Sequence, residues 1–280
     1  MAFTLLCRHM KTSTQREISC QNIADKSKIW QFTYRLYHRL RWLPAQLRAV
    51  LNNRPTIEIT NELGRFTALP LTNTVRETDP THQAELHHWI TEAPSGIFID
   101  VNAGSGFFTR LAVTKGPATK AYAFEGNPSV YALLLKNIAD NNLEAEGFNI
   151  AISREAGRMN LAPHSVNTGH TSSCSGKSGV DVATRPLDGF MQAREIDAGN
   201  VSLIRIESEG YELSALAGMR ATLQQMQPGS RLFIRLWNGS NASEMTMSLL
   251  RWSGFREIEK SGEYHLFEKT VEQNYNLLDQ

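Results

Sequence analysis

The feature that most constrains this chain is a regular alternation of strand-like and helix-like segments that begins near residue 96. Short apolar runs such as Ile97–Ile99, Ala121–Phe124 and Val201–Ile206 have the length of buried strands, and segments with helical spacing of apolar residues separate them. Consecutive parallel strands need such connections, because the chain must return to the same end of the sheet. The alternation therefore predicts an α/β fold with a doubly wound, mostly parallel sheet.

Seven strands are expected in this sheet, with helices covering both of its faces. They are Ile97–Ile99, Ala121–Phe124, Phe148–Ile152, Val201–Ile206, Arg231–Leu236, Phe255–Ile258 and Tyr264–Phe267. The last two are predicted to form an antiparallel pair that closes the sheet. N-terminal to all seven strands, Thr56–Leu69 is predicted to form a hairpin, and Asp79-Pro80 is predicted to begin a helix.

Charge separates a basic N-terminal extension from an acidic body. Residues 1–55 hold ten Lys and Arg against two acidic residues, a net +8, so the rest of this chain of net charge +1 carries −7. Within the extension, residues 29–51 have leucines at helical spacing among arginines and aromatic residues, which predicts an amphipathic helix. Such a helix suits an anionic membrane surface, although packing on the body or on a second subunit is the other interpretation. No nucleic-acid contact is expected, because no nucleic-acid motif accompanies these residues.

The chain is expected to have four regions: the extension 1–55, a hairpin and helix at 56–95, the main domain at 96–270 and a tail at 271–280. Three cysteines without Cys/His clustering predict neither a disulfide framework nor a metal site. No apolar run is long enough to cross a bilayer, and the N-terminus does not have the pattern of a secretory signal. The expected compartment is the cytoplasm, with peripheral membrane contact through the basic helix as the further hypothesis.

Small and acidic residues follow the first two strands of the predicted sheet. Asp100 opens the run Asp-Val-Asn-Ala-Gly-Ser-Gly that ends at Gly106, and Glu125 follows the second strand. Ligands of parallel sheets bind beyond the carboxyl ends of the strands, where glycines let the backbone approach closely. A carboxylate such as Glu125 can accept both hydroxyls of a ribose. The pattern indicates a nucleoside-binding half of the sheet.

The details of the glycine turn narrow the nucleoside. Thr109 stands where the dinucleotide fingerprint needs its third glycine, and the turn opens with an acid that would repel a pyrophosphate. No phosphate-binding loop of the nucleotide-triphosphatase type is present. An acid suits a ligand with an amino group, such as S-adenosylmethionine. A nicotinamide-dependent oxidoreductase is the rival enzyme class.

Residues 97–267 resemble the FkbM family of S-adenosylmethionine-dependent methyltransferases. Six elements carry the resemblance in the family's order: Asp100–Gly106, Ala123–Pro128, Lys136-Asn137 with Asn141, Asn167–Ser172, Thr184–Asp188 and Arg205–Glu212. The resemblance implies a Rossmann-like methyltransferase fold with S-adenosylmethionine as cofactor. It also implies O-methylation of a hydroxyl on a sugar, a glycan or a small natural product.

The resemblance places the cofactor-binding residues in the two loops and on the third strand. They are Asp100, Asn102, Ala103, Gly104, Gly106, Glu125, Asn127 and Ala151. It implies that the glycine turn holds the methionine part and that Glu125 holds the ribose. Asn127 and residues 149–152 would then lie near the adenine.

Glu207, Glu209 and His170 are the candidate bases for a hydroxyl acceptor. The two glutamates follow the fourth strand at the predicted cleft, where Glu209 could equally cap the next helix. His170 lies in the polar stretch 164–179, which has the composition of a substrate lid, and an exposed histidine without a role is the alternative. Tyr211 is a candidate for the acceptor pocket or for packing.

Five positions depart from the family pattern. Asn102 replaces a glycine, Gly104 an asparagine, Gly126 a proline, Arg205 a lysine and Glu207 an aspartate. Asparagine tolerates the left-handed backbone region better than most residues, so the turn is expected to survive. Asn102 and the longer side chain of Glu207 motivate a hypothesis of a different class, a catalytically weakened methyltransferase fold that serves as a binding or scaffold protein.

Overall fold

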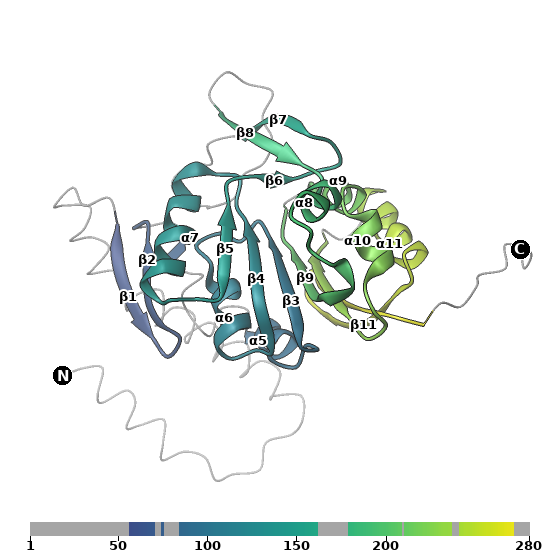
Figure 1. Ribbon diagram of the computed structural model, residues 1–280, viewed down its shortest axis with the longest axis horizontal. Helices are drawn as coiled ribbons and strands as arrows, with labels where there is room; N and C mark the ends of the chain where they lie inside the picture. The colour runs from purple at the N-terminus through teal and green to yellow at the C-terminus, as the bar shows by residue number, and fades with distance from the viewer. Residues whose placement is uncertain are drawn as a thin grey trace, which may run out of the picture. The chain divides into compact units, whose positions relative to one another are not determined.

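The computed structural model describes residues 56–70, 74–75, 84–161, 179–208, 210–236 and 241–271 (Figure 1). Its main sheet has seven strands in the order β11-β12-β10-β9-β3-β4-β5. The strands are β3 Gly96–Val101, β4 Ala118–Phe124, β5 Ala145–Phe148, β9 Val201–Ile206, β10 Arg231–Arg235, β11 Phe255–Ser261 and β12 Tyr264–Lys269. Only β12 runs antiparallel to its neighbours. The predicted Rossmann-like sheet and its closing antiparallel pair are confirmed.

Strand side chains alternate between two apolar cores, one on each face of the sheet. Ile99 of β3 and Ile204 of β9 belong to the core under α8, α9, α10 and α11, whereas Phe98 and Leu203 belong to the core under α5 and α6. This is the two-residue period of a strand, with both faces buried. The helices are α5 Ala84–Thr91, α6 Phe107–Thr114, α7 Pro128–Asp140, α8 Leu187–Ala193, α9 Glu212–Ala217, α10 Arg220–Gln225 and α11 Asn241–Trp252.

The start of α7 has the local chemistry that its sequence predicts. The side chain of Asn127 accepts a hydrogen bond from the Ser129 N–H at 3.0 Å, and Pro128 occupies the first turn. An asparagine cap satisfies a backbone donor that the helix itself leaves unpaired, and proline lacks that donor. The helix start at Asp79-Pro80 lies outside the described residues, and the described helix α5 begins at Ala84.

The predicted single strand Phe148–Ile152 is wrong. The main-sheet strand β5 ends at Phe148, and β6 (Ala151–Ile152) pairs in a separate sheet of order β6-β8-β7. The Asn149 side chain explains the break, because it donates to the carbonyls of Glu125 and Gly126 at 2.8 and 2.9 Å and bends the chain toward them.

The small sheet was not predicted. It joins β6 to β7 (Gly157–Leu161) and β8 (Val180–Arg185), with β8 parallel to β6 and antiparallel to β7. Figure 1 shows it beyond the carboxyl ends of β4 and β5. It therefore lies where a parallel sheet binds its ligands.

The helical segment after β9 is divided at Gly218 into α9 and α10. A Cβ atom on Gly218 would lie 2.1 Å from the carbonyl oxygen of Ser153. The chain passes so close to the loop after β6 that only glycine fits, and the helix is interrupted there.

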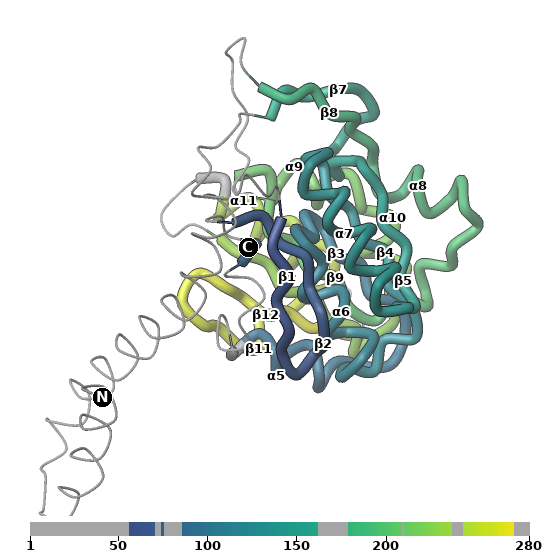
Figure 2. Tube along the Cα trace, turned by 90° about the vertical axis from the view of Figure 1, so that its left-hand side faces the viewer, coloured from purple at the N-terminus to yellow at the C-terminus, as the bar shows by residue number. Residues whose placement is uncertain are grey.

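The predicted hairpin is confirmed as β1 (Ile57–Asn61) paired with β2 (Gly64–Ala68). Phe66 stacks on Phe107 of α6 with ring centroids 5.8 Å apart. Arg110 lies over the Phe66 ring and donates to the carbonyl of Arg65 at 3.1 Å. Figure 2 shows the hairpin against the main domain, where β2 contacts α7. The extension 1–55 lies outside the described residues.

No helix within the described ranges is long and apolar enough to cross a membrane.

Candidate functional site

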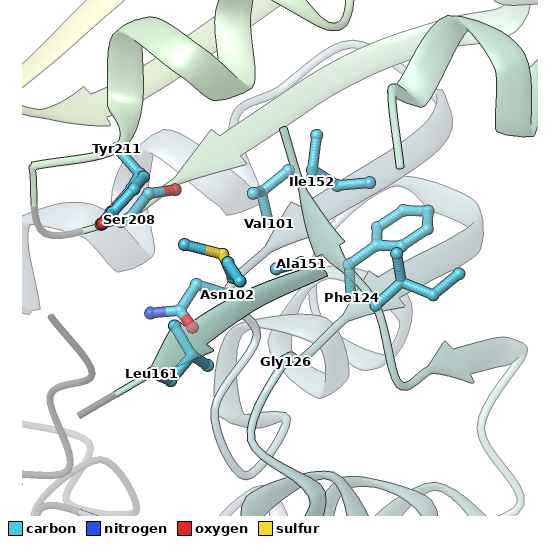
Figure 3. Close-up of a pocket in the computed structure, with 11 residues that line it drawn as sticks. Val101, Asn102, Phe124, Gly126, Ala151, Ile152, Leu161, Ser208 and Tyr211 are labelled. Carbon is cyan, nitrogen blue, oxygen red and sulfur yellow. The ribbon is translucent and has the colours of Figure 1, made fainter. Parts of the chain in front are cut away.

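A pocket lies at the carboxyl edge of the main sheet, between the ends of β3, β4 and β9 and the small sheet (Figure 3). Its lining residues are Val101, Asn102, Phe124, Gly126, Ile150, Ala151, Ile152, Met159, Leu161, Ser208 and Tyr211. Figure 3 shows Asn102, Ser208 and Tyr211 toward one side and Phe124 and Ile152 toward the other. The pocket thus has a polar side and an apolar side, the usual form of a small-molecule site.

The glycine turn begins at Asn102, which lines this pocket. Asn102, Gly104 and Gly106 all have left-handed backbone angles, with φ of 62°, 59° and 88°. A Cβ atom on Gly106 would lie 2.7 Å from Leu134 Cδ1, so this position needs glycine for space as well.

Asn102 fits the turn in place of the family glycine. Its Nδ2 donates to the backbone carbonyl of Glu207 at 2.7 Å. The bond ties the loop after β3 to the loop after β9, and it offsets the cost of a left-handed conformation for a residue with a side chain.

Glu125 joins the first two loops of the site. It is buried, and its Oε2 accepts from the Gly104 N–H at 3.0 Å while its Oε1 accepts from the Asn127 N–H at 2.8 Å. Charge-assisted bonds of this kind are stronger than neutral ones. The carboxylate therefore holds the glycine turn against the start of α7.

The second departure from the family pattern has a steric reason. A Cβ atom on Gly126 would lie 3.3 Å from Ala151 Cβ and 3.2 Å from Leu161 Cδ1. The small sheet packs directly on this loop, and a Cβ atom here would require these neighbours to move by a few tenths of an ångström.

Asp100 lies at the turn, but its side chain is turned into the protein. It is fully buried, with Oδ1 accepting from Arg205 Nη1 at 2.9 Å and Oδ2 from Thr109 Oγ1 at 2.6 Å. Asp100 and Arg205 face each other across the paired strands β3 and β9. The carboxylate that was expected to meet the cofactor instead links two strands to helix α6.

Arg205 is the cation of this buried pair. Its Nη2 also donates to Glu207 Oε2, and its guanidinium lies 4.4 Å over the ring of Phe108. Burial alone would lower the pKa of Arg205, but the charges of Asp100 and Glu207 outweigh that effect and raise it.

The Glu207 side chain lies in an ion network. Besides Arg205, it accepts from the Tyr264 hydroxyl at 2.9 Å and from Arg235 Nη1 at 3.4 Å. Arg235 also donates twice to Glu263 Oε2, at 3.0 and 2.9 Å. Two guanidinium groups stabilise the carboxylate charge, which opposes its predicted role as a base. Burial and the charge of Glu207 raise the pKa of Tyr264, so its hydroxyl remains a donor.

Glu212 is a buried carboxylate that the sequence reasoning did not single out. Both of its oxygens accept from the Gly210 N–H, at 3.0 and 2.9 Å. Burial raises the pKa of Glu212, these backbone bonds oppose the shift, and the charge of Glu207 adds to it. Glu212 thereby holds the loop that carries Ser208 and Tyr211.

The other predicted residues divide into three groups. Ala151 and Tyr211 line the pocket, whereas Ala103 packs behind the turn and Asn127 caps α7. Glu209 and His170 lie outside the described residues. Three pocket residues were not predicted from the sequence: Ser208, Met159 and Leu161. The last two lie in the small sheet, and the alternating pattern of Val180–Arg185 was the signal that could have indicated that sheet. Within the described ranges, no three His, Cys, Asp or Glu side chains come together as a metal site.

Replacing Asp100 with asparagine should cost about 3–5 kcal/mol of unfolding free energy, because the buried guanidinium of Arg205 loses one of its two carboxylate partners. Asp181→Asn is the matched control, since its pair with Arg158 is exposed and worth roughly 0–1 kcal/mol. Urea unfolding of both variants measures the difference. Equal small losses would contradict the structural role of Asp100.

Glu212→Gln should gain stability relative to the wild type as the pH rises from about 4 toward neutrality. The folded-state pKa of Glu212 is raised, so the wild type binds this proton more tightly when folded and loses stability as the pH passes above the unfolded pKa. Urea unfolding across this range, with the exposed Glu58→Gln as control, checks it. A pH-independent difference between Glu212→Gln and the wild type would refute it.

Comparisons with known proteins identify the family. The family described as Methyltransferase FkbM domain matches residues 99–256, more than half of the chain. Hexuronic acid methyltransferase AglP from Haloferax volcanii is 23% identical over 224 residues, which cover 79% of this chain and 90% of that protein.

Two solved structures are also similar. Methyltransferase FkbM from Methylobacillus flagellatus is 20% identical with a TM-score of 0.43, over 62% of this chain and 43% of that one, so this chain spans less than half of its length. M. jannaschii TYW2, in complex with AdoMet, is 13% identical with a TM-score of 0.40, over 76% and 84%. The family match, together with the sheet and its glycine turn, shows that the chain belongs to the FkbM methyltransferase family.

Proposed function

We propose that this chain is an S-adenosylmethionine-dependent methyltransferase that methylates a hydroxyl of a sugar, with a hexuronic acid as the first candidate acceptor. The observation that carries the proposal is the two-sided pocket beside the glycine turn, at the edge where such sheets bind ligands. The hexuronic acid class rests on the AglP relative alone.

The residues present fit this cofactor. Phe124, Ile152 and Leu161 offer the apolar surroundings that an adenine ring needs. The left-handed turn at Asn102–Gly106 brings backbone close to the pocket. In this proposal a ribose hydroxyl contacts Glu125, the buried carboxylate that holds the glycine turn and the start of α7.

The cofactor supplies a methyl group on a sulfonium, which is reactive without further activation. The chain must hold an acceptor oxygen in line with that methyl group, and this is mainly orientation. Ser208 and Tyr211 lie on the polar side of the pocket and are suited to contact the acceptor. The base remains Glu209 or His170 in this proposal, because Glu207 is held by two arginines.

The scaffold alternative loses its motivation in this structure. Asn102 adopts the required backbone angle and gains a bond to the next loop. Glu207 and Arg205, which replace a shorter acid and a lysine of the family pattern, pair with each other. Both departures are accommodated, which supports an active enzyme. The nicotinamide-dependent alternative disagrees with the family match.

The contacts of residues 1–55 stay predictions: an anionic membrane surface or a second subunit, without nucleic acid. The cytoplasmic placement stays a prediction as well.

The direct test is incubation of the full chain with S-adenosylmethionine and an oligosaccharide that ends in a hexuronic acid. We expect a mass gain of one methyl group, placed on a hydroxyl oxygen by NMR. The matched oligosaccharide with a neutral hexose tests the acid requirement. Cofactor binding without transfer to either sugar would overturn the acceptor class and leave the cofactor proposal standing.

Glu125→Gln should weaken binding of S-adenosylhomocysteine by about 1.5–3 kcal/mol, because a charged acceptor to the ribose and to the turn is lost. Isothermal titration of the folded variant measures the effect. Glu144→Gln, an exposed glutamate before β5, is the control and should bind like the wild type. Unchanged affinity of the Glu125 variant would refute the ribose placement.

A further inference from the structure

Asn137 of α7 is fully buried and uses its whole amide. Its Nδ2 donates to the Ser105 carbonyl at 2.8 Å and to the Thr67 carbonyl at 3.1 Å. Its Oδ1 accepts from the Thr67 N–H at 2.7 Å. One side chain thus joins the hairpin strand β2 to the middle of the glycine turn.

The turn depends on such outside bonds, because it has little side-chain packing of its own. Ser105 is fully buried between two glycines with left-handed backbone angles. One helical turn before Asn137, Leu134 fills the space beside Gly106. Helix α7 therefore contacts the turn through two residues that lie one helical turn apart on the same face.

The hairpin lies before the segment 99–256 that the family match covers. Even so, β2 packs along α7, as Figures 1 and 2 show, and reaches the turn through one amide. Buried backbone groups without partners are costly, so loss of the amide would let both segments shift to satisfy them.

We propose that Asn137 is a positioning residue that makes the β1–β2 hairpin part of the cofactor-binding machinery. By fixing the Ser105 carbonyl, it sets the backbone of Gly104 and Gly106, in the turn whose first residue, Asn102, lines the pocket. The inference rests on the proposed cofactor function.

Asn141 provides a matched control. It lies one turn further along the helix, and its Nδ2 donates to the Arg65 carbonyl at 2.9 Å and to the Asn137 carbonyl at 2.8 Å. It holds the same hairpin by the same type of side chain, and its two hydrogen bonds do not involve the glycine turn.

The experiment titrates S-adenosylhomocysteine into the full chain carrying Asn137→Ala or Asn141→Ala. We expect roughly tenfold weaker binding for Asn137→Ala and less than about twofold for Asn141→Ala. Urea unfolding of each variant establishes that it is folded at the temperature of the titration. Equal weakening in the two variants would mean that Asn137 acts only through hairpin stability, and it would overturn the inference.

Two additions keep the outcome decisive. Asn137→Ser, which leaves a small polar group in the same space, replaces the alanine variant if that one does not fold. Hydrogen exchange of the ligand-free variants follows the amides of Gly104 to Phe107 directly. If the wild type does not bind S-adenosylhomocysteine, the cofactor proposal fails and the inference is overturned with it. If the wild type binds but exchange is not faster in the Asn137 variant, the inference alone is overturned.

Discussion

The buried ion pair between Asp100 and Arg205 is the interaction on which the rest of the site depends. It joins the neighbouring strands β3 and β9, whose carboxyl ends carry two of the loops beside the pocket. Buried charges are costly unless they are paired, and removal of either partner leaves the other with less compensation. From this pair, contacts extend to α6 through Thr109 and to β10 and β12 through Glu207. The ion pair thereby fixes the positions of the loops that follow these strands.

Much of the fold could be predicted because its signals are local. Strand runs with both faces buried, the Asn127-Pro128 cap and the closing pair each depend on neighbouring residues. The prediction of one strand at Phe148–Ile152 was wrong, because periodicity does not show where an apolar run leaves one sheet and enters another. That break depends on the Asn149 side chain and its bonds to a loop more than twenty residues earlier. The small sheet was missed for a similar reason: Ala151 pairs with Thr184 across a long separation.

The candidate site could be predicted in position but only partly in side-chain role. Residue type and place after a strand were enough to bring Asn102 and Ala151 to the pocket. They were not enough for Asp100, whose direction is decided by an arginine 105 residues away. In the same way, Glu207 looks like a base until Arg235 and Tyr264 from other strands are placed beside it. Electrostatic roles are set by tertiary neighbours, which no local pattern contains.

The small sheet supplies part of the pocket lining and is separate from the seven-stranded main sheet. Met159 and Leu161 reach the pocket from β7, which pairs with β8 in the small sheet. A change of size at either position would reshape the pocket and leave the register of the seven strands and the buried ion pair untouched. Ligand preference in this chain can therefore be redesigned, or drift during evolution, most readily at the half-buried Met159, with the strand pairing of the main sheet unchanged.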